Sequence, residues 1–169
     1  MPASRADLTA YLETLGIETA TVEHPPLFTV EQSQKLRGEI AGGHTKNLFL
    51  KDKKDAVFLV VAGEDAEVDM KSLHRRIGSA RLSFGRAELL AELFGVLPGS
   101  VTPFGAFNDV ERRVTVILDE GLMRHEFLNF HPLENTATTT IRSDDLLRFL
   151  RATGHEPKIL PVAGPALPE

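Results

Sequence analysis

The stretch from Gly42 to Asp52 constrains the fold of this chain more than any other part of it. Two glycines are followed by Lys46 and then by the run Leu48-Phe49-Leu50. Glycine allows a backbone to bend and to approach another group closely, and leucine and phenylalanine favour a half-buried strand. A second β-prone run covers residues 56–62 after a polar four-residue connection. We therefore expect a β-hairpin whose first strand, residues 45–51, begins close to Lys46.

Lys46 has two interpretations on local sequence alone. The glycines bring the backbone close to a ligand, so the ammonium group is placed to meet a substrate. Alternatively, the glycines form an ordinary turn and Lys46 ends a strand in solvent. The local sequence does not decide between these interpretations.

Composition predicts one globular domain. The chain has 169 residues, of which 42% are hydrophobic and 25% charged, and this is ordinary for a domain with a real core. The absence of cysteine excludes disulfides, thiolate metal sites and a cysteine nucleophile. The first residues lack the apolar segment of a signal peptide, and no later run reaches membrane-spanning length. We expect a cytoplasmic protein that does not enter a membrane.

Charge is uneven along the chain. The net charge is −5, yet residues 35–86 contain eleven Lys or Arg against seven Asp or Glu. An acidic whole argues against sequence-blind nucleic-acid binding, which needs many phosphate contacts, but a local basic patch can still bind a short stretch of phosphates. The alternative is an ordinary solvated face with mixed charges.

Helices and strands are expected to alternate along the chain. Helices are expected after the cap Ser4 as far as Gly16, over 29–36, after the cap Asp69 as far as Gly78, over 86–94, and after the cap Ser143 as far as Gly154. Strands are expected over 19–23, 45–51, 56–62, 114–118, 126–130 and 138–141, with a short segment over 81–84 and a loop over 97–108. This pattern predicts an α+β (mixed α/β) domain over residues 1–160, with helices packed on a curved mixed sheet. Residues 161–169, which are rich in proline, are expected to be a poorly ordered tail.

Common catalytic and nucleotide-binding motifs are missing. The chain has no Gly-x-Gly-x-x-Gly after a strand, no phosphate loop ending in Gly-Lys-Ser/Thr, no Gly-x-Ser-x-Gly and no His-Glu-x-x-His. His44, His74, His125 and His155 do not have metal-ligand spacing, so we expect no metal and no cofactor. Asp144 and Asp145 fall in the first turn of a helix, where they complement its dipole.

Four blocks in a fixed order carry a family resemblance. They are His24-Pro25-Pro26 with Phe28-Thr29, the run Gly42 to Leu50, the Gly-x-x-x-Pro loop Gly99 to Pro103, and Phe130-His131-Pro132 with Asn135. One such block alone is a weak signal, whereas four in order across a domain-sized chain are specific. The chain resembles the YbaK-like prolyl-tRNA editing proteins, freestanding relatives of the insertion domain of bacterial prolyl-tRNA synthetase, over most of its length.

The resemblance implies hydrolysis of the ester of a mischarged tRNA for proline. It implies Lys46, Gly99 and His131 as catalytic residues. Water attack on an aminoacyl ester builds negative charge on the carbonyl oxygen, and backbone amides of Gly99 to Pro103 are suited to stabilise that charge. Lys46 acts as a cation on a phosphate or the carbonyl, since its ordinary pKa of about 10.4 rules out a general base without strong burial. A ribose hydroxyl of the tRNA is expected to orient the water, and His131 to limit the amino-acid pocket.

Further residues are assigned by their place in the matching blocks or in the basic part of the chain. The substrate-binding candidates are Phe28, Thr45, Asn47, Ser100, Val101, Pro103, Phe104 and Asn135. The tRNA-binding candidates are Lys51, Arg75, Arg76 and Arg81. Without the resemblance, a phenylalanine is more often core, an asparagine a turn or cap, and a lone histidine a satisfied edge residue. The expected partners are the acceptor end of tRNA and prolyl-tRNA synthetase, with a monomer as the default state.

The amino acid that is removed rests on resemblance alone. A site built for proline rejects smaller residues weakly, because a missing methylene is worth only about 1 to 3 kcal/mol, so a second site is needed to destroy the error. The chain is most similar to members that remove alanine, and the cysteine-removing branch is the alternative. Two other classes stay open: a non-catalytic module that only binds tRNA or a partner, and a small-molecule esterase, which leaves the basic segment unexplained.

Overall fold

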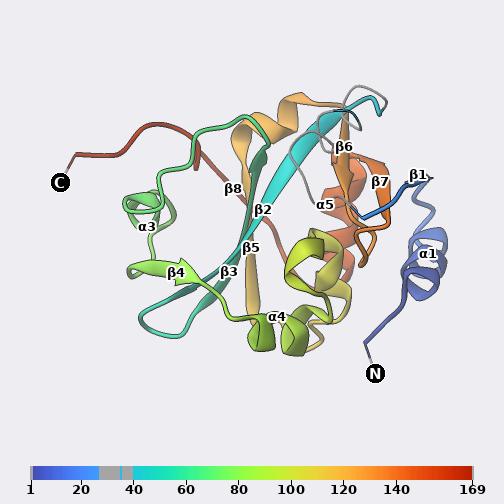
Figure 1. The fold of residues 1–169 in the computed structure, drawn as a ribbon, viewed down its shortest axis with the longest axis horizontal. Helices are drawn as coiled ribbons and strands as arrows, with labels where there is room; N and C mark the ends of the chain where they lie inside the picture. The colour runs from blue at the N-terminus through green and yellow to red at the C-terminus, as the bar shows by residue number, and fades with distance from the viewer. Residues whose placement is uncertain (1, 27–34, 36–39, 169) are drawn as a thin grey trace.

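A mixed β-sheet runs through the molecule (Figure 1). The structure is a computed structural model that describes residues 2–26, 35 and 40–168. The described residues form eight strands in the order β1-β7-β6-β2-β3-β5-β8, with β4 also paired to β2. The strands are β1 (Thr19–Glu23), β2 (Gly43–Asp52), β3 (Val57–Gly63), β4 (Leu82–Phe84), β5 (Val114–Asp119), β6 (Phe127–Phe130), β7 (Ala137–Arg142) and β8 (Lys158–Leu160). Parallel and antiparallel pairs both occur, so the predicted mixed α/β class is confirmed.

The predicted hairpin is present as β2 and β3. Their antiparallel register runs from Thr45 opposite Gly63 to Lys51 opposite Val57. The carboxylate of Asp52 closes the connection, because it accepts hydrogen bonds from the backbone N–H groups of Lys54 and Ala56, each at 2.9 Å. The polar connection thus fixes the register of the hairpin.

The α-helices lie where apolar periodicity and caps place them. They are α1 (Arg5–Thr14), α3 (Leu73–Ile77), α4 (Ala87–Phe94) and α5 (Ser143–Ala152), and the short 3-10 helices are η1 (Pro98–Ser100), η2 (Pro103–Phe107) and η3 (Glu120–Arg124). Ser4 caps the start of α1, as predicted, and with Asp7 it forms a complete capping box. Gly95 ends α4 in the left-handed region at φ 67°, a conformation that favours glycine.

Three expectations about element boundaries are corrected. Helix α3 begins four residues after Asp69, whose carboxylate caps the preceding turn by accepting from the backbone and the hydroxyl of Ser72. Ser143 is the first residue of α5, and the cap position belongs to Arg142, whose side chain makes no capping hydrogen bond. Strand β8 has no counterpart in the sequence prediction. The helix expected over 29–36 falls outside the described residues, apart from residue 35.

Two apolar clusters lie on opposite faces of the sheet. The larger cluster contains Phe49, Leu59 and Val61, together with buried residues of α1, α4, α5 and η2. The smaller cluster contains Leu50, Val60 and Ala62, together with Leu73 of α3 and Val162. Side chains along a strand alternate between faces, so each residue of β2 is assigned to one cluster or the other by its position.

The segment of residues 161–168, here called the C-terminal strap, is attached to the sheet, contrary to the expectation of poor order. The side chain of Val162 is fully buried. The carboxylate of Asp119 accepts from the backbone N–H groups of Val162 and Ala163, at 3.0 and 3.2 Å. Gly164 donates to the carbonyl of Glu67 at 2.7 Å. The assignment of residues 1–160 to one domain stays a prediction.

Within the described part of the chain, no helix is long and apolar enough to cross a membrane. The same residues contain no group of three or more histidines and carboxylates arranged to hold a metal ion.

A buried hydrogen bond joins the segment after α5 to the segment before β5. His155 Nε2 lies 2.8 Å from Asp109 Oδ2, and both side chains are 1% exposed. Burial by itself raises the pKa of Asp109, but hydrogen bonds from His155 and from the N–H groups of Val114 and Arg113 outweigh it and hold that pKa below its ordinary value. The carboxylate form is therefore the one that the fold stabilises.

We expect Asp109→Asn to lower the free energy of unfolding by about 3 kcal/mol, because it leaves the partner groups of a buried pair unmatched. Because the pKa of Asp109 is lowered, its contribution is complete above the unfolded value of about 3.9 and is lost as pH falls through the folded value. Urea denaturation at several pH values measures this. The control is Glu156→Gln in the exposed pair with Arg151. Equal effects of the two substitutions would contradict the prediction.

Candidate active site

Strand β2 has an edge that is only partly paired. The carbonyl of His44 accepts from Glu64, and Asp52 donates to Ala56, so the even-numbered residues of β2 direct their backbone groups toward β3. The odd-numbered residues direct theirs toward the other edge, where β6 pairs with residues 43–44 and β4 with residues 50–52. Between these two pairings lie residues 45–49 of β2, here called the interval. Backbone groups of Asn47 point into this interval.

Lys46 lies in the interval on the face of the smaller cluster. It is opposite Ala62 in β3, and its Nζ donates to the carbonyl of Ala66. Ala66 belongs to the turn after β3, which closes through a 3.0 Å hydrogen bond to Gly63. The next residue, Glu67, is bound by the C-terminal strap. The ammonium group is therefore half-buried and held by one backbone carbonyl at the surface of the sheet.

Thr45 and Asn47 point to the opposite face from Lys46. The hydroxyl of Thr45 donates to the carbonyl of Asn129 at 2.8 Å and accepts from the side-chain amide of Asn47 at 3.3 Å. The other side-chain atom, Asn47 Oδ1, is buried and has no hydrogen-bond partner among the described residues. A buried acceptor without a partner costs free energy, so this oxygen is suited to receive a donor from a ligand.

A buried asparagine joins β2 to β6. The side-chain amide of Asn129 donates to the carbonyls of Ala41 and Gly43, at 3.1 and 3.3 Å, and its oxygen accepts from Thr140 at 2.5 Å. A Cβ atom on Gly43 would lie 2.9 Å from the ring of His125, so the close approach here requires glycine. Sequence reasoning missed Asn129, although a polar residue inside the apolar strand Phe127–Phe130 was a usable signal.

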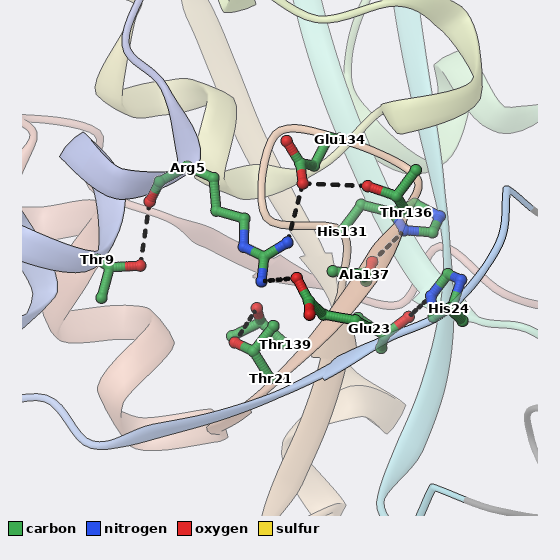
Figure 2. Close-up of polar contacts among 11 residues, drawn as sticks. Arg5, Thr9, Thr21, Glu23, His24, His131, Glu134, Thr136, Ala137 and Thr139 are labelled. Carbon is green, nitrogen blue, oxygen red and sulfur yellow. Dashed lines mark hydrogen bonds and ion pairs between the residues drawn. The ribbon is translucent and has the colours of Figure 1, made fainter.

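His131 follows β6 directly and is half-buried. Its Nδ1 lies 3.0 Å from the carbonyl of Ala137, and its ring centroid lies 6.4 Å from that of His24 (Figure 2). Burial lowers the pKa of His131; the hydrogen bond to Ala137 opposes this shift, and the charge of His24 adds to it. A carbonyl only accepts, so the neutral ring carries its proton on Nδ1 and leaves Nε2 as an acceptor.

His24 was not among the predicted site residues, although it belongs to one of the matching blocks. Its Nε2 lies 2.9 Å from the hydroxyl of Thr138, and its Nδ1 lies 2.8 Å from the carbonyl of Pro25. Its backbone N–H donates to the carbonyl of Thr136 at 2.9 Å. His24 is therefore fixed beside the loop that carries His131.

The Gly-x-x-x-Pro loop approaches this histidine loop. A Cβ atom on the exposed Gly99 would lie 3.5 Å from Asn135 Nδ2, so the two predicted site residues are neighbours. Ser100 and Pro103 are buried, and Val101 is half-buried against the larger cluster. Pro103 begins η2 and fixes the end of the loop.

Phe104 belongs to the core and not to an exposed pocket wall. Its side chain is 0% exposed and packs edge-on against Phe130 and Phe149, with ring centroids 5.9 and 5.4 Å apart. This agrees with the general tendency of a phenylalanine in a small domain to be core. Phe28, the other predicted wall, falls outside the described residues.

The β2 and β6 register relates Lys46 to His131. His44 is opposite Asn129 in this parallel pair. Lys46 and His131 each come two residues later in their segments, so continuing the same register would place them opposite each other on the same face. Three of the cavities in the described structure are lined in part by Glu92 of α4, and these three are not lined by Lys46, Gly99 or His131. That these three residues line one common cavity stays a prediction.

The four basic candidates separate into two pairs. Lys51 pairs with Asp55 at 2.9 Å, and the exposed Arg81 lies at the start of β4, near the tip of the hairpin. Arg75 and Arg76 instead donate to carbonyls of the C-terminal strap. Both pairs belong to the part of the molecule that contains α3 and β4, and Figure 1 shows these elements far from β6 and β7, which lie toward the opposite end of the sheet.

We expect His131 to titrate below its ordinary value of 6.5 and to carry the neutral proton on Nδ1. The reason is burial, which disfavours the charged ring, combined with the carbonyl of Ala137 on Nδ1. Ring-nitrogen NMR over a pH titration measures both quantities, with His131→Gln assigning the signal. A midpoint above 6.5, or a neutral ring protonated on Nε2, would contradict this expectation.

Comparisons with known proteins identify the family to which this chain is similar. The family model for the aminoacyl-tRNA editing domain matches residues 24–149. The chain is 44% identical to the prolyl-tRNA synthetase associated domain-containing protein 1 of Danio rerio, over 92% of this chain and 86% of that protein. It is 36% identical to the prolyl-tRNA editing protein ProX of Acetoanaerobium sticklandii, over 86% of this chain and 90% of that protein.

A solved structure shares the fold. The crystal structure of a candidate trans-editing enzyme for prolyl tRNA synthetase matches with a TM-score of 0.69 and 23% identity, over 95% of this chain and 98% of that one. With the family match over most of the chain, this protein belongs to the aminoacyl-tRNA editing domain family, as a YbaK-like prolyl-tRNA editing protein.

Proposed function

We propose that this protein hydrolyses the ester of mischarged tRNA for proline, and that alanine is the amino acid removed. The alternative substrate is the cysteine ester of the same tRNA. Membership of the editing family supports the reaction class, and ProX, a relative at 36% identity, is named as a prolyl-tRNA editing protein. The choice of alanine rests on the resemblance of the His-Thr-Lys-Asn run to alanine-removing members.

The observation that carries this proposal is the state of His131. Its Nδ1 is bound by the carbonyl of Ala137, its pKa is lowered, and its loop meets Gly99 through Asn135. A neutral imidazole whose Nε2 has no hydrogen-bond partner among the described residues accepts hydrogen bonds at physiological pH, either from water or from the α-ammonium group of an aminoacyl ester. In this proposal, His131 bounds the amino-acid pocket and orients one of these donors.

The chemical step is attack of water on the ester carbonyl. The carbonyl oxygen gains negative charge, the C–O bond to the ribose then breaks, and the ribose oxygen takes up the proton that the water has lost. Products are the free amino acid and uncharged tRNA. Backbone N–H groups of the loop from Gly99 to Pro103 stabilise the oxyanion, and an exposed glycine allows the substrate to approach closely.

Lys46 contributes charge in this scheme. Its ammonium group is held by the carbonyl of Ala66, which keeps it near the interval of β2 without neutralising it. From there it stabilises a phosphate of the terminal adenosine or the ester carbonyl. Asn47 Oδ1, which has no partner in the described part of the chain, offers a second polar contact for the substrate.

We expect Lys46→Ala to reduce deacylation of alanyl-tRNA for proline by about a hundredfold with the fold intact, since it removes one charged stabiliser of the transition state. The matched control is Lys158→Ala, which alters an exposed lysine on β8. The assay follows loss of labelled alanine, cysteine or proline from the charged tRNA. Full activity of Lys46→Ala would remove this residue from the mechanism.

The same assay separates the alternative functions. Selective loss of alanine supports the proposed substrate, and selective loss of cysteine supports the alternative. Binding of tRNA without loss of any ester supports a non-catalytic module. Hydrolysis of small esters without activity on charged tRNA supports a small-molecule esterase.

Contacts with the tRNA backbone are assigned to Lys51 and Arg81. We expect alanine at either position to raise KM and to reduce the slope of log affinity against log salt by about one, because each neutralises one phosphate. Arg75→Ala should leave the slope unchanged, since its guanidinium already donates to the C-terminal strap. Binding titrations between low and moderate salt test this. Equal slopes for Arg81→Ala and Arg75→Ala would contradict the assignment.

The proposed substrate also sets the partners and the compartment. A protein that acts on charged tRNA belongs in the cytoplasm with the translation machinery. The name of the relative from Danio rerio associates it with prolyl-tRNA synthetase, and this supports the synthetase as a second partner of this chain. The acceptor end of the tRNA stays the primary partner.

A further inference from the structure

Arg5 joins three segments that are distant in sequence. Its Nη1 donates to Glu134 and its Nη2 to Glu23, each at 2.9 Å (Figure 2). Arg5 lies in the first turn of α1, Glu23 ends β1, and Glu134 lies in the loop between β6 and β7. The guanidinium is the most shielded of the three groups, at 27% exposure against 76% for Glu23 and 45% for Glu134. The planar guanidinium group thus binds one carboxylate through each of its two terminal nitrogens.

These contacts belong to a closed ring of interactions that includes the loop of residues 131–136, which carries His131. The hydroxyl of Thr136 donates to the same oxygen of Glu134, at 3.0 Å, and the carbonyl of Thr136 accepts from His24 at 2.9 Å. His24 is bonded directly to Glu23, which returns the ring to Arg5. The ring therefore fixes His24 and the loop that begins at His131 relative to each other.

The loop that belongs to this ring contains a residue in an unfavourable backbone conformation. Leu133 has a φ of 71°, in the left-handed region that a leucine rarely adopts. Such a conformation persists where surrounding contacts over-determine it. On one side of Leu133 is His131, bound to the carbonyl of Ala137, and on the other is Asn135, which meets Gly99.

The helix that carries Arg5 is firmly anchored in the protein. Leu8 and Leu12 on the same helix are 1% and 3% exposed, and the capping box of Ser4 and Asp7 fixes the first turn. Arg5 therefore extends from an anchored element toward a loop that has a strained residue. Partly exposed ion pairs contribute little to global stability, so the expected effect of this contact is on loop position.

From this geometry we propose that Arg5 is a positioning residue, which holds the segment from His131 to Asn135 in its working position against Gly99. It acts through Glu134 and Glu23 and touches no substrate. The inference rests on the proposed function for its kinetic consequence, but its structural part is measurable without any activity. It assigns a role in the site to the first helix, which contributes none of the predicted site residues.

The kinetic test compares Arg5→Gln with Arg142→Gln. Arg142 forms an ion pair of the same 2.9 Å length with Glu126, at the opposite end of β6 and β7. We expect Arg5→Gln to lower kcat for deacylation by tenfold or more with KM within about twofold, since small displacements of positioned groups cost up to about a hundredfold in rate. Arg142→Gln should change kcat by less than about twofold, because a lost surface ion pair has little effect by itself.

A spectroscopic readout distinguishes positioning from simple loss of charge. The titratable group whose charge acts directly on His131 is His24, whereas Glu23, Glu134 and Arg5 are connected to its loop through the ring. Arg5→Lys keeps the positive charge but replaces the planar fork by a compact ammonium group, which cannot hold Glu134 and Glu23 in the fixed geometry of a guanidinium. We expect the NMR titration midpoint of His131 to rise in both Arg5→Gln and Arg5→Lys, because a loosened loop exposes the ring to water.

The outcomes separate this inference from the proposed function. A His131 midpoint that moves in Arg5→Gln but stays unchanged in Arg5→Lys would overturn positioning in favour of charge alone. Wild-type kcat in Arg5→Gln with an unmoved His131 would overturn it also, while leaving the deacylase function standing. If the wild-type protein deacylates no charged tRNA, the proposed function fails, and the His131 titrations still decide whether Arg5 holds the loop.

Discussion

The pairing of β2 with three neighbouring strands is the constraint on which the site depends. Along one edge β2 pairs with β3 over its length, and along the other it pairs first with β6 and then with β4. Alternation of side chains places Lys46 and Asn47 on opposite faces. A ligand that contacts both must therefore meet the strand at its edge, in the interval where the described structure pairs β2 with neither β6 nor β4. The location of the candidate site follows from strand pairing before any side-chain chemistry is considered.

Local signals made much of the fold predictable. The capping box at Ser4, the polar connection at Asp52 and the glycine after α4 act through neighbours within a few residues, so the sequence shows both partners together. The family blocks likewise named Gly99 and Asn135, which the structure places side by side. The structure shows only that these two residues are neighbours, and their chemical roles stay predictions.

Features that depend on distant partners were not predictable. Strand β8 is three residues long and partly exposed, and its partner β5 is about forty residues earlier in the chain. The C-terminal strap looked like a tail because the acceptor of its N–H groups, Asp119, is remote in sequence. The hydrogen bonds from Arg76 to the strap carbonyls were likewise hidden, because those carbonyls are remote in sequence, and its predicted phosphate contact stays a prediction. In each case, the missing information was a long-range partner.

If the proposed function holds, the placement of positive charges indicates that this protein distinguishes amino acids at the ester group and does not rely on high affinity for tRNA in general. Arg75 and Arg76 bind the strap, and Arg5 binds two glutamates, so these three cations serve structure first. Selection between amino acids depends on differences in transition-state binding, and tighter binding of all tRNAs would not increase it. A modest backbone contact at Lys51 and Arg81, combined with a well-fixed loop at His131, meets that requirement. Selectivity then depends on how firmly the loop is held.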